Sequence, residues 1–268
     1  MTRVPTVLSI AGSDSGGGAG VQADLKAFAR VGVHGMTAIT AITAQNTVGV
    51  EIVEPVSPRT IVSQVRMVAE DIGVDAVKIG MLGRQETVEA VVDALAYVGA
   101  APVVIDPVMV AESGAILLDE DARRTCVERL LPLATVVTPN IPEARVLTRS
   151  EESVAQPDLA RAVVALGPRA AVVTGGHSAE VVDYFYAGEE VTPIRGPRHP
   201  DGASHGSGCT HSASLAAFLA LGHELLAAAE KAREVTSEAV KNGLRDVGEG
   251  AGPVDVFGLA ERAREPAQ

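Results

Sequence analysis

The sequence predicts an α/β protein: a single-domain, three-layer α/β/α fold with a mostly parallel central sheet and a small β-hairpin and edge-strand element. Short apolar, β-branched runs alternate with segments of helical periodicity along the chain, which is typical of parallel strands joined by crossover helices. No Pro/Ser-rich linker, repeat or low-complexity tract divides the sequence. We therefore expect one domain over residues 1–268.

The individual elements follow from these runs and from the turn residues between them. Strands are expected at residues 4–11, 36–43, 75–79, 102–105, 135–138 and 170–175. An edge strand or hairpin is expected at 48–56, and a β-hairpin at 181–186 and 191–194. Helices are expected from Val21 onward and at 57–72, 86–98, 119–131, 158–166, 207–221 and 224–242. Ser57 followed by Pro58 is a typical helix start.

A glycine-rich turn, His205-Gly206-Ser207-Gly208-Cys209-Thr210, precedes the helix expected at 207–221. Leu215, Phe218, Leu219 and Gly222 recur at helical spacing, so one buried face is expected. Unpaired N–H groups and the helix dipole would let residues 206–209 hold a phosphate group and would favour a thiolate at Cys209, as base or nucleophile. The alternative is an ordinary helix start, capped by Ser207 or Thr210, with an inert cysteine.

A second glycine-rich loop, residues 12–20, follows the first expected strand and precedes a helix. Residues 18–23 match a GxGxxA dinucleotide fingerprint, but no carboxylate stands about twenty residues further on to bind a ribose. A P-loop motif is absent from the sequence. Asp24 lies in the first turns of this helix, where the helix dipole stabilises a carboxylate. The alternative is that Asp24 faces a ligand cleft at the carboxyl end of the strand.

Polar and flexible residues follow several expected strands, and parallel strands would bring them to one edge of the sheet. These residues are Gly12, Gln45, Met81, Asp106, Asn140 and Thr174. Asp106 and Asn140 are also compatible with a turn and a helix cap, and Glu143 with a capping box. Carboxylates, an amide and a helix N-terminus together favour phosphoryl transfer with Mg²⁺.

A zinc site is the competing interpretation of the histidines and cysteine in this part of the chain. Its ligands would be His199, His205, Cys209 and His211, but no CxxC or HExxH motif accompanies them.

Composition narrows the classes of partner and compartment. With 22 basic and 34 acidic residues the net charge is −12, which argues against a broad nucleic-acid or anionic-membrane surface. Charged residues interrupt the apolar runs, and the start of the chain lacks a signal-peptide pattern. Cys126 and Cys209 lie far apart, and Cys126 is expected to be structural. A cytoplasmic protein that binds neither nucleic acid nor membrane is expected.

Several motifs, in order along nearly the whole chain, resemble the hydroxymethylpyrimidine/phosphomethylpyrimidine kinases of thiamine biosynthesis, in the ribokinase superfamily. The motifs are Ala11-Gly-Ser-Asp-Ser-Gly-Gly-Gly-Ala-Gly-Val-Gln-Ala-Asp-Leu-Lys26, Thr43-Ala-Gln-Asn-Thr47, Lys78-Ile-Gly-Met-Leu82, Asp106-Pro-Val-Met109, Thr138-Pro-Asn-Ile-Pro-Glu-Ala144, Gly175-Gly-His177 and His205-Gly-Ser-Gly-Cys-Thr210.

The resemblance implies a role for each candidate site residue. Asp24 and Gln45 would bind the polar edge of the pyrimidine, and Gly12, Met81 and Val108 would shape its pocket. Asp106, Asn140 and Thr174 would contact ATP, with Glu143 and Asp106 placing Mg²⁺. Gly206, Ser207 and Gly208 would form the anion hole. Cys209 would be the catalytic base, where most sugar kinases of the superfamily carry Asp.

The implied activity is ATP- and Mg²⁺-dependent phosphorylation of 4-amino-5-hydroxymethyl-2-methylpyrimidine and then of its monophosphate, by a homodimer. One departure is Thr174, where many relatives have Lys before Gly-Gly-His, so another basic side chain would have to compensate. The alternatives are a pyridoxal kinase of the same subfamily, a non-catalytic pyrimidine-binding sensor and, less in keeping with the motifs, a Rossmann dehydrogenase.

Overall fold

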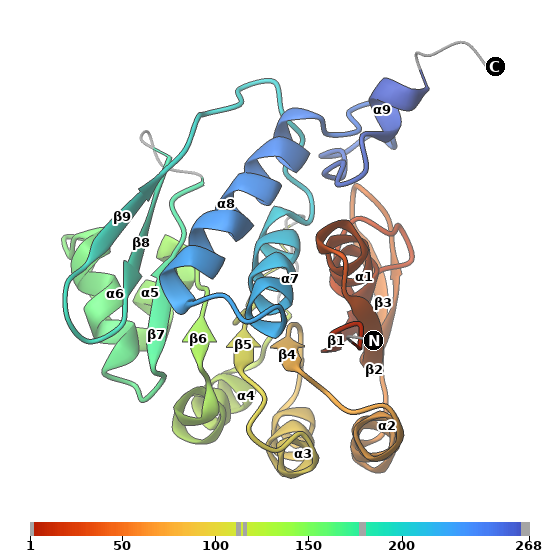
Figure 1. The fold of residues 1–268 in the computed structure, drawn as a ribbon, viewed down its shortest axis with the longest axis vertical. Helices are drawn as coiled ribbons and strands as arrows, with labels where there is room; N and C mark the ends of the chain where they lie inside the picture. The colour runs from red at the N-terminus through yellow and green to blue at the C-terminus, as the bar shows by residue number, and fades with distance from the viewer. Residues whose placement is uncertain (1–2, 111–113, 115–116, 177–180, 264–268) are drawn as a thin grey trace.

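The computed structural model describes residues 3–110, 114, 117–176 and 181–263, and its centre is one nine-stranded sheet (Figure 1). The strands lie in the order β3-β2-β1-β4-β5-β6-β7-β8-β9. The parallel strands are β1 (Thr6–Ser13), β2 (His34–Gln45), β4 (Ala76–Ile79), β5 (Val103–Ile105), β6 (Val136–Val137) and β7 (Ala170–Val173). The mostly parallel sheet expected from the sequence is confirmed.

Antiparallel strands flank this parallel centre on both sides. β3 (Val50–Pro55) pairs with β2 and forms one edge, while β8 (Val182–Tyr186) and β9 (Thr192–Arg195) extend the other edge from β7. The expected edge strand and hairpin are therefore present, and both belong to the main sheet.

Helices cover both faces of the sheet (Figure 1). One layer contains α1 (Gly20–Val31), α7 (Ser207–Ala220) and α8 (Leu225–Lys241). The other contains α2 (Pro58–Asp71), α3 (Gln85–Ala94), α4 (Glu120–Thr125), α5 (Ile141–Thr148) and α6 (Gln156–Val164). Successive side chains of β1 point to opposite faces of the sheet. Val7 packs in the apolar core under α1, α7 and α8, while Leu8 and Ile10 pack in the core under the other helical layer. A last short helix, α9, spans Leu259–Arg262.

The predicted one-sided burial of the 207–221 helix is wrong. In α7, all residues from Thr210 to Ala217 are buried, whereas Phe218 and Leu219 in the expected apolar stripe are only partly buried. Small side chains such as Ala213 and Ala216, both 0% exposed, let α7 lie between the sheet and α8. The N-terminus of α7 is therefore held by packing on several sides.

Several boundaries differ from the predictions because local chemistry changes the backbone. The helix expected at 119–131 is broken into α4, a π-helical turn η2 at Cys126–Leu130 and a 3₁₀ turn η3 at Leu131–Leu133 that includes Pro132. The helix expected at 86–98 ends as α3 and continues as the 3₁₀ turn η1, Leu95–Tyr97. Cys126 is 3% exposed in the core, as its predicted structural role requires.

No helix in the described part of the chain is long and apolar enough to cross a membrane.

Candidate active site

The predicted strand-end residues lie along one edge of the sheet, because β1, β2, β4, β5, β6 and β7 all run in the same direction. Several of them also touch or pair. A side chain at Gly12 would overlap the methyl group of Met81, so the backbone of β1 lies directly against that residue. Asn140 and Thr174 form a parallel bridge, with the Thr174 N–H donating to Pro139 O at 2.9 Å. The predicted convergence at the carboxyl edge is confirmed for these pairs.

The turn before α7 opens the helix without a side-chain cap, so capping by Ser207 or Thr210 is not observed. The N-cap residue is Gly206, in the left-handed region at φ 82°. A side chain there would overlap the carbonyl oxygen of Gly18, so only glycine fits. The hydroxyl of Thr210 is buried and has no hydrogen-bond partner among the described residues. The start of α7 thus keeps backbone donors that an anion can use.

Cys209 lies in the first turn of α7, and the N–H of Gly20, the first residue of α1, is directed at its sulfur. Burial raises the pKa of the thiol to about 12, and the charges of Asp106 and Asp24 also raise it, while Lys78 lowers it. The prediction that the helix field favours a thiolate is therefore wrong, because the loss of hydration on burial outweighs the dipole.

Asp24 does not face an open cleft in this structure. Its side chain is 0% exposed, pairs with Lys78 at 2.8 Å and accepts a hydrogen bond from the Ser9 hydroxyl at 2.6 Å. Lys78 is also 0% exposed. Burial alone would lower the pKa of Lys78, but the charges of Asp24, Cys209 and Asp106 raise it above its ordinary value. The contact between Asp24 and a pyrimidine stays a prediction.

Sequence reasoning missed Lys78 as a functional candidate. A lysine flanked by Val77 and Ile79 in a buried strand was the available signal, because buried lysines are rare unless they are paired.

Asp106 and Glu143 form the acidic part of the site. Asp106 is 5% exposed, accepts a hydrogen bond from the Ser212 hydroxyl at 3.0 Å, and has a pKa raised by burial. Burial and the charge of Asp106 raise the pKa of Glu143 to about 7. Asp106 also reaches α7, because a Cβ at Gly208 would lie 3.9 Å from its carboxylate.

The capping interpretation of Asn140 and Glu143 is confirmed. The Asn140 side chain accepts from the Glu143 N–H at 2.8 Å, and the Glu143 carboxylate accepts from the Asn140 N–H at 3.0 Å. Any part in ATP or metal binding is therefore additional to this structural role.

The residues at this corner fit a magnesium ion. The charge of Asp106 raises the pKa of Glu143, and a cation between phosphate oxygens and carboxylates offsets such repulsion. Mg²⁺ commonly uses one or two carboxylates and completes its coordination with phosphate and water.

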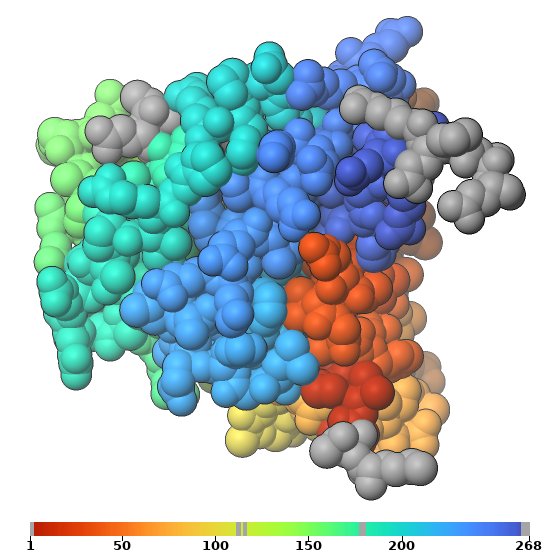
Figure 2. Space-filling model, turned by 45° about the horizontal axis from the view of Figure 1, so that its top comes forward, coloured from red at the N-terminus to blue at the C-terminus, as the bar shows by residue number. Residues whose placement is uncertain are grey.

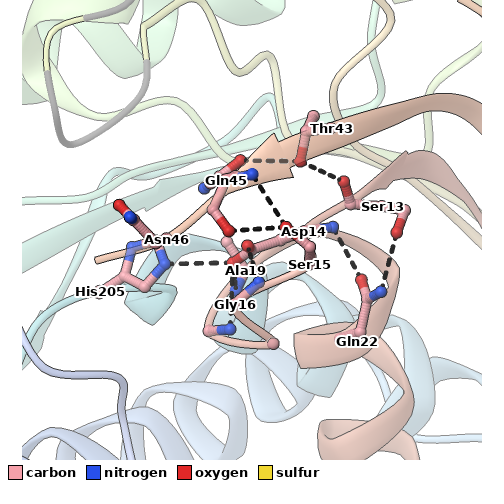
Figure 3. Close-up of polar contacts among 12 residues, drawn as sticks. Ser13, Asp14, Ser15, Gly16, Ala19, Gln22, Thr43, Gln45, Asn46 and His205 are labelled. Carbon is pink, nitrogen blue, oxygen red and sulfur yellow. Dashed lines mark hydrogen bonds and ion pairs between the residues drawn. The ribbon is translucent and has the colours of Figure 1, made fainter. Parts of the chain in front are cut away.

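Gln45 lines an open hollow of about 420 Å³ at the end of β2. Its side-chain oxygen accepts from the Thr43 hydroxyl at 3.3 Å. Its backbone N–H and C=O bind the Ser15 hydroxyl at 2.8 and 2.6 Å, which ties β2 to the loop 12–20 (Figure 3). Gly12, Met81 and Asp24 do not line this hollow, and Val108 is half-buried after β5.

Asp14 organises the loop 12–20 (Figure 3). Its carboxylate accepts the N–H groups of Gly16 at 2.8 Å, Gly18 at 3.0 Å and Ala19 at 2.8 Å. It also lies 3.2 Å from Nε2 of His205. Although burial alone would raise it, the pKa of Asp14 is lowered by His205 and these N–H groups. Sequence reasoning did not single out Asp14.

The structure does not bring the candidate zinc ligands together. His205 faces Asp14, His199 lies 2.9 Å from the Ser237 hydroxyl, and His211 is buried within α7. In the part of the chain that the structure describes, no group of at least three His, Cys, Asp or Glu side chains is arranged to hold a metal. His177, in the Gly-Gly-His motif, lies outside the described residues.

Comparison with known proteins agrees with this geometry. A family model described as phosphomethylpyrimidine kinase matches residues 14–255. The hydroxymethylpyrimidine/phosphomethylpyrimidine kinase of Rhizobium meliloti (strain 1021) is 46% identical over 256 residues, covering 93% of this chain and 96% of that relative.

Two solved structures share the fold closely. The ADP complex of Bacillus subtilis pyridoxal kinase is 36% identical with a TM-score of 0.88, covering 96% of this chain and 99% of that one. The phosphomethylpyrimidine kinase of Clostridium difficile 630 is 38% identical with a TM-score of 0.79, covering 89% of this chain and 100% of that one.

Proposed function

The chain belongs to the phosphomethylpyrimidine kinase family, and we propose that it transfers the γ-phosphoryl group of ATP to the hydroxymethyl group of 4-amino-5-hydroxymethyl-2-methylpyrimidine and then to the resulting monophosphate. The observation that carries this proposal is the N-terminus of α7, which opens at Gly206 without a side-chain cap and lies beside the carboxylate of Asp106. Free backbone donors beside a carboxylate suit a transferred phosphoryl group and its counter-ion.

Each group at this corner has a defined task. The acceptor ring would lie against Gly12, Met81 and Val108, with Asp24 and Gln45 at its polar edge. As the hydroxymethyl oxygen bonds to the γ-phosphorus, the bond from that phosphorus to the ADP oxygen breaks. The proton of the hydroxyl passes to the sulfur of Cys209 in its thiolate form.

The Ser207 N–H already donates to Ser204 O at 2.9 Å, so the backbone donors of Gly206, Gly208 and Cys209 stabilise the negative charge on the moving phosphoryl group. Asn140 and Thr174 lie side by side at the ends of β6 and β7, where they would contact the nucleotide. Glu143 and Asp106 would hold Mg²⁺, which supplies charge neutralisation of the phosphates.

The decisive assay is ADP release by the purified protein with the pyrimidine alcohol, its monophosphate and pyridoxal, compared as kcat/KM. We expect the pyrimidine substrates to be preferred. Similarity to the Bacillus subtilis pyridoxal kinase makes pyridoxal the second candidate, and a higher kcat/KM for pyridoxal would replace the proposal. Absence of ADP release with every acceptor would favour a pyrimidine-binding sensor.

We also propose a cytoplasmic homodimer. The β2–β3 hairpin supports the dimer, because Ile42 and Ile52 are 55% and 53% exposed. The register pairs Ala44 with Ile52 and Ile42 with Glu54, so these apolar residues share one face. A second copy of the chain would remove that face from water.

A further inference from the structure

We propose that the Asp14–His205 hydrogen bond is a positioning contact that locks the loop 12–20 onto the turn 206–209 and so fixes the acceptor hydroxyl relative to the anion hole. The two residues lie 191 positions apart in sequence, and their side chains are 3.2 Å apart. This inference rests on the proposed kinase function for its catalytic consequence, but the contact itself is structural.

The loop side of the contact is built around one carboxylate. The Oδ1 atom of Asp14 accepts from Gly16, and Oδ2 accepts from Gly18 and Ala19 as well as facing His205 (Figure 3). Because an ionised carboxylate only accepts hydrogen bonds, Nε2 of His205 carries the donating proton. The histidine therefore binds the same oxygen that shapes the path of the loop into α1.

The turn side of the contact is fixed by the backbone of His205. Its N–H donates to Gly252 O at 3.2 Å, and its C=O accepts from the Val254 N–H at 3.1 Å. These bonds make a parallel bridge to Pro253. In Figure 2 the blue C-terminal segment lies against the red-orange N-terminal region, and a Cβ at Gly18 would lie 3.2 Å from Cβ of Pro253. His205 thus cannot shift without moving the next residue, Gly206.

Close packing makes the junction stiff. A side chain at Gly18 would overlap the ring of His205, and one at Gly206 would overlap the carbonyl of Gly18. The same loop ends at Gly20, whose N–H points at the sulfur of Cys209. The loop 12–20, which would border the acceptor ring, and the turn that would receive the phosphoryl group therefore meet at the Asp14–His205 contact and at the Gly20–Cys209 contact.

The consequence concerns alignment and not nucleotide affinity. Neither Asp14 nor His205 is placed among the groups that touch the reacting atoms. Loss of the bond lets the loop and the turn move relative to each other. A misplacement of about 1 Å costs about a hundredfold in rate. The expected change is therefore in kcat.

The test compares three substitutions of His205 that differ in whether the new side chain has a hydrogen-bond donor and in how far that donor reaches. His205→Ala removes the ring. His205→Gln places an amide nitrogen near the position of Nε2, and His205→Asn places it near Nδ1, too short to reach Asp14. We expect Ala and Asn to lower kcat by about 10- to 100-fold, with Gln within about fivefold of wild type. The Kd for ATP should stay within about twofold of wild type in all three.

The second readout is independent of activity. Amide hydrogen exchange in peptides covering residues 14–20 and 206–210 should be faster than in wild type in both His205→Ala and His205→Asn. In His205→Gln it should match the wild-type rates. Because Asn and Gln are close in size and polarity, equal Tm values for these two variants separate positioning from general loss of stability.

Each outcome is decisive. A wild-type kcat in His205→Ala overturns the positioning role, and so does an equal loss of kcat in His205→Asn and His205→Gln. Unchanged exchange in residues 14–20 also overturns it. If wild-type protein phosphorylates no acceptor, the proposed function fails, while coupled exchange that Gln restores still supports the contact.

Discussion

Lys78 and Asp24 form an ion pair in which both side chains are 0% exposed, with Nζ 2.8 Å from one carboxylate oxygen and 3.0 Å from the other. The pair joins β4 to α1. It places one buried cation among three groups that are negatively charged when ionised, namely Asp24, Asp106 and Cys209.

Removing the cation leaves a buried carboxylate unpaired, so Lys78→Met should lower the free energy of unfolding by about 3–5 kcal/mol. Urea unfolding followed by circular dichroism measures the loss. The control is Lys78→Met combined with Asp24→Asn, which removes both charges and should recover much of the loss. Equal destabilisation in the single and double variants would show that the pair is energetically unimportant.

Cys209→Ala should lower kcat by roughly 10²- to 10⁴-fold, because a general base contributes that much, while the Kd for ATP stays unchanged. Steady-state ADP release and nucleotide titration measure the two quantities. Cys126→Ala is the matched control, since Cys126 is also a free cysteine and is buried in the apolar core. Full activity in Cys209→Ala would remove this residue as the base.

The pKa of Cys209, which burial raises to about 12, has a kinetic consequence. A base works only when deprotonated, and below its pKa the thiolate fraction grows tenfold per pH unit. We therefore expect kcat to rise with pH between about 6.5 and 9. Iodoacetamide labelling of Cys209 should be slow at pH 7 and follow the same rise. A kcat that is flat in pH, with fast labelling at pH 7, would contradict this.

Glu143 should make the folded protein less stable as pH rises. Its folded pKa is about 7, above the ordinary 4.5, so the folded state holds more protons than the unfolded state between these values. Its contribution is full below about 4.5 and is lost as pH rises to about 7. Glu143→Gln should flatten the unfolding free energy over this range.

Glutamine keeps the capping box of α5, so the comparison isolates the charge. The same variant should weaken Mg²⁺-dependent stabilisation by nucleotide. A wild-type profile identical to that of Glu143→Gln would exclude the raised pKa.

Ile52→Asp should convert the proposed dimer to a monomer, because it places a charge on the shared apolar face of the β2–β3 hairpin. Analytical ultracentrifugation measures the mass in solution. The matched control is Val53→Asp, which lies on the opposite face of β3 and is 40% exposed. A wild-type monomer, or equal effects of the two substitutions, would reject this face as the interface.

The sequence predicted the fold and the sheet edge well, because both depend on short-range signals. Strand runs, the Ser57-Pro58 helix start and the Asn140–Glu143 capping box are determined by residues close together in the chain. The periodicity of α7 misled because a helix packed on several sides by small residues has no single apolar face. The break of the 119–131 helix likewise depended on a local π-helical turn before Pro132.

The sequence alone determined the class of fold, the glycine turn before α7 and the resemblance to pyrimidine kinases, since composition, spacing and motif order carry that information. Only the tertiary structure decided what each charged group faces. Burial set the pKa of Cys209, enclosed Asp24 with Lys78, and joined Asp14 to His205 across 191 residues. These outcomes depend on desolvation and on contacts between distant segments, which exist only once the sheet and its two helical layers have assembled.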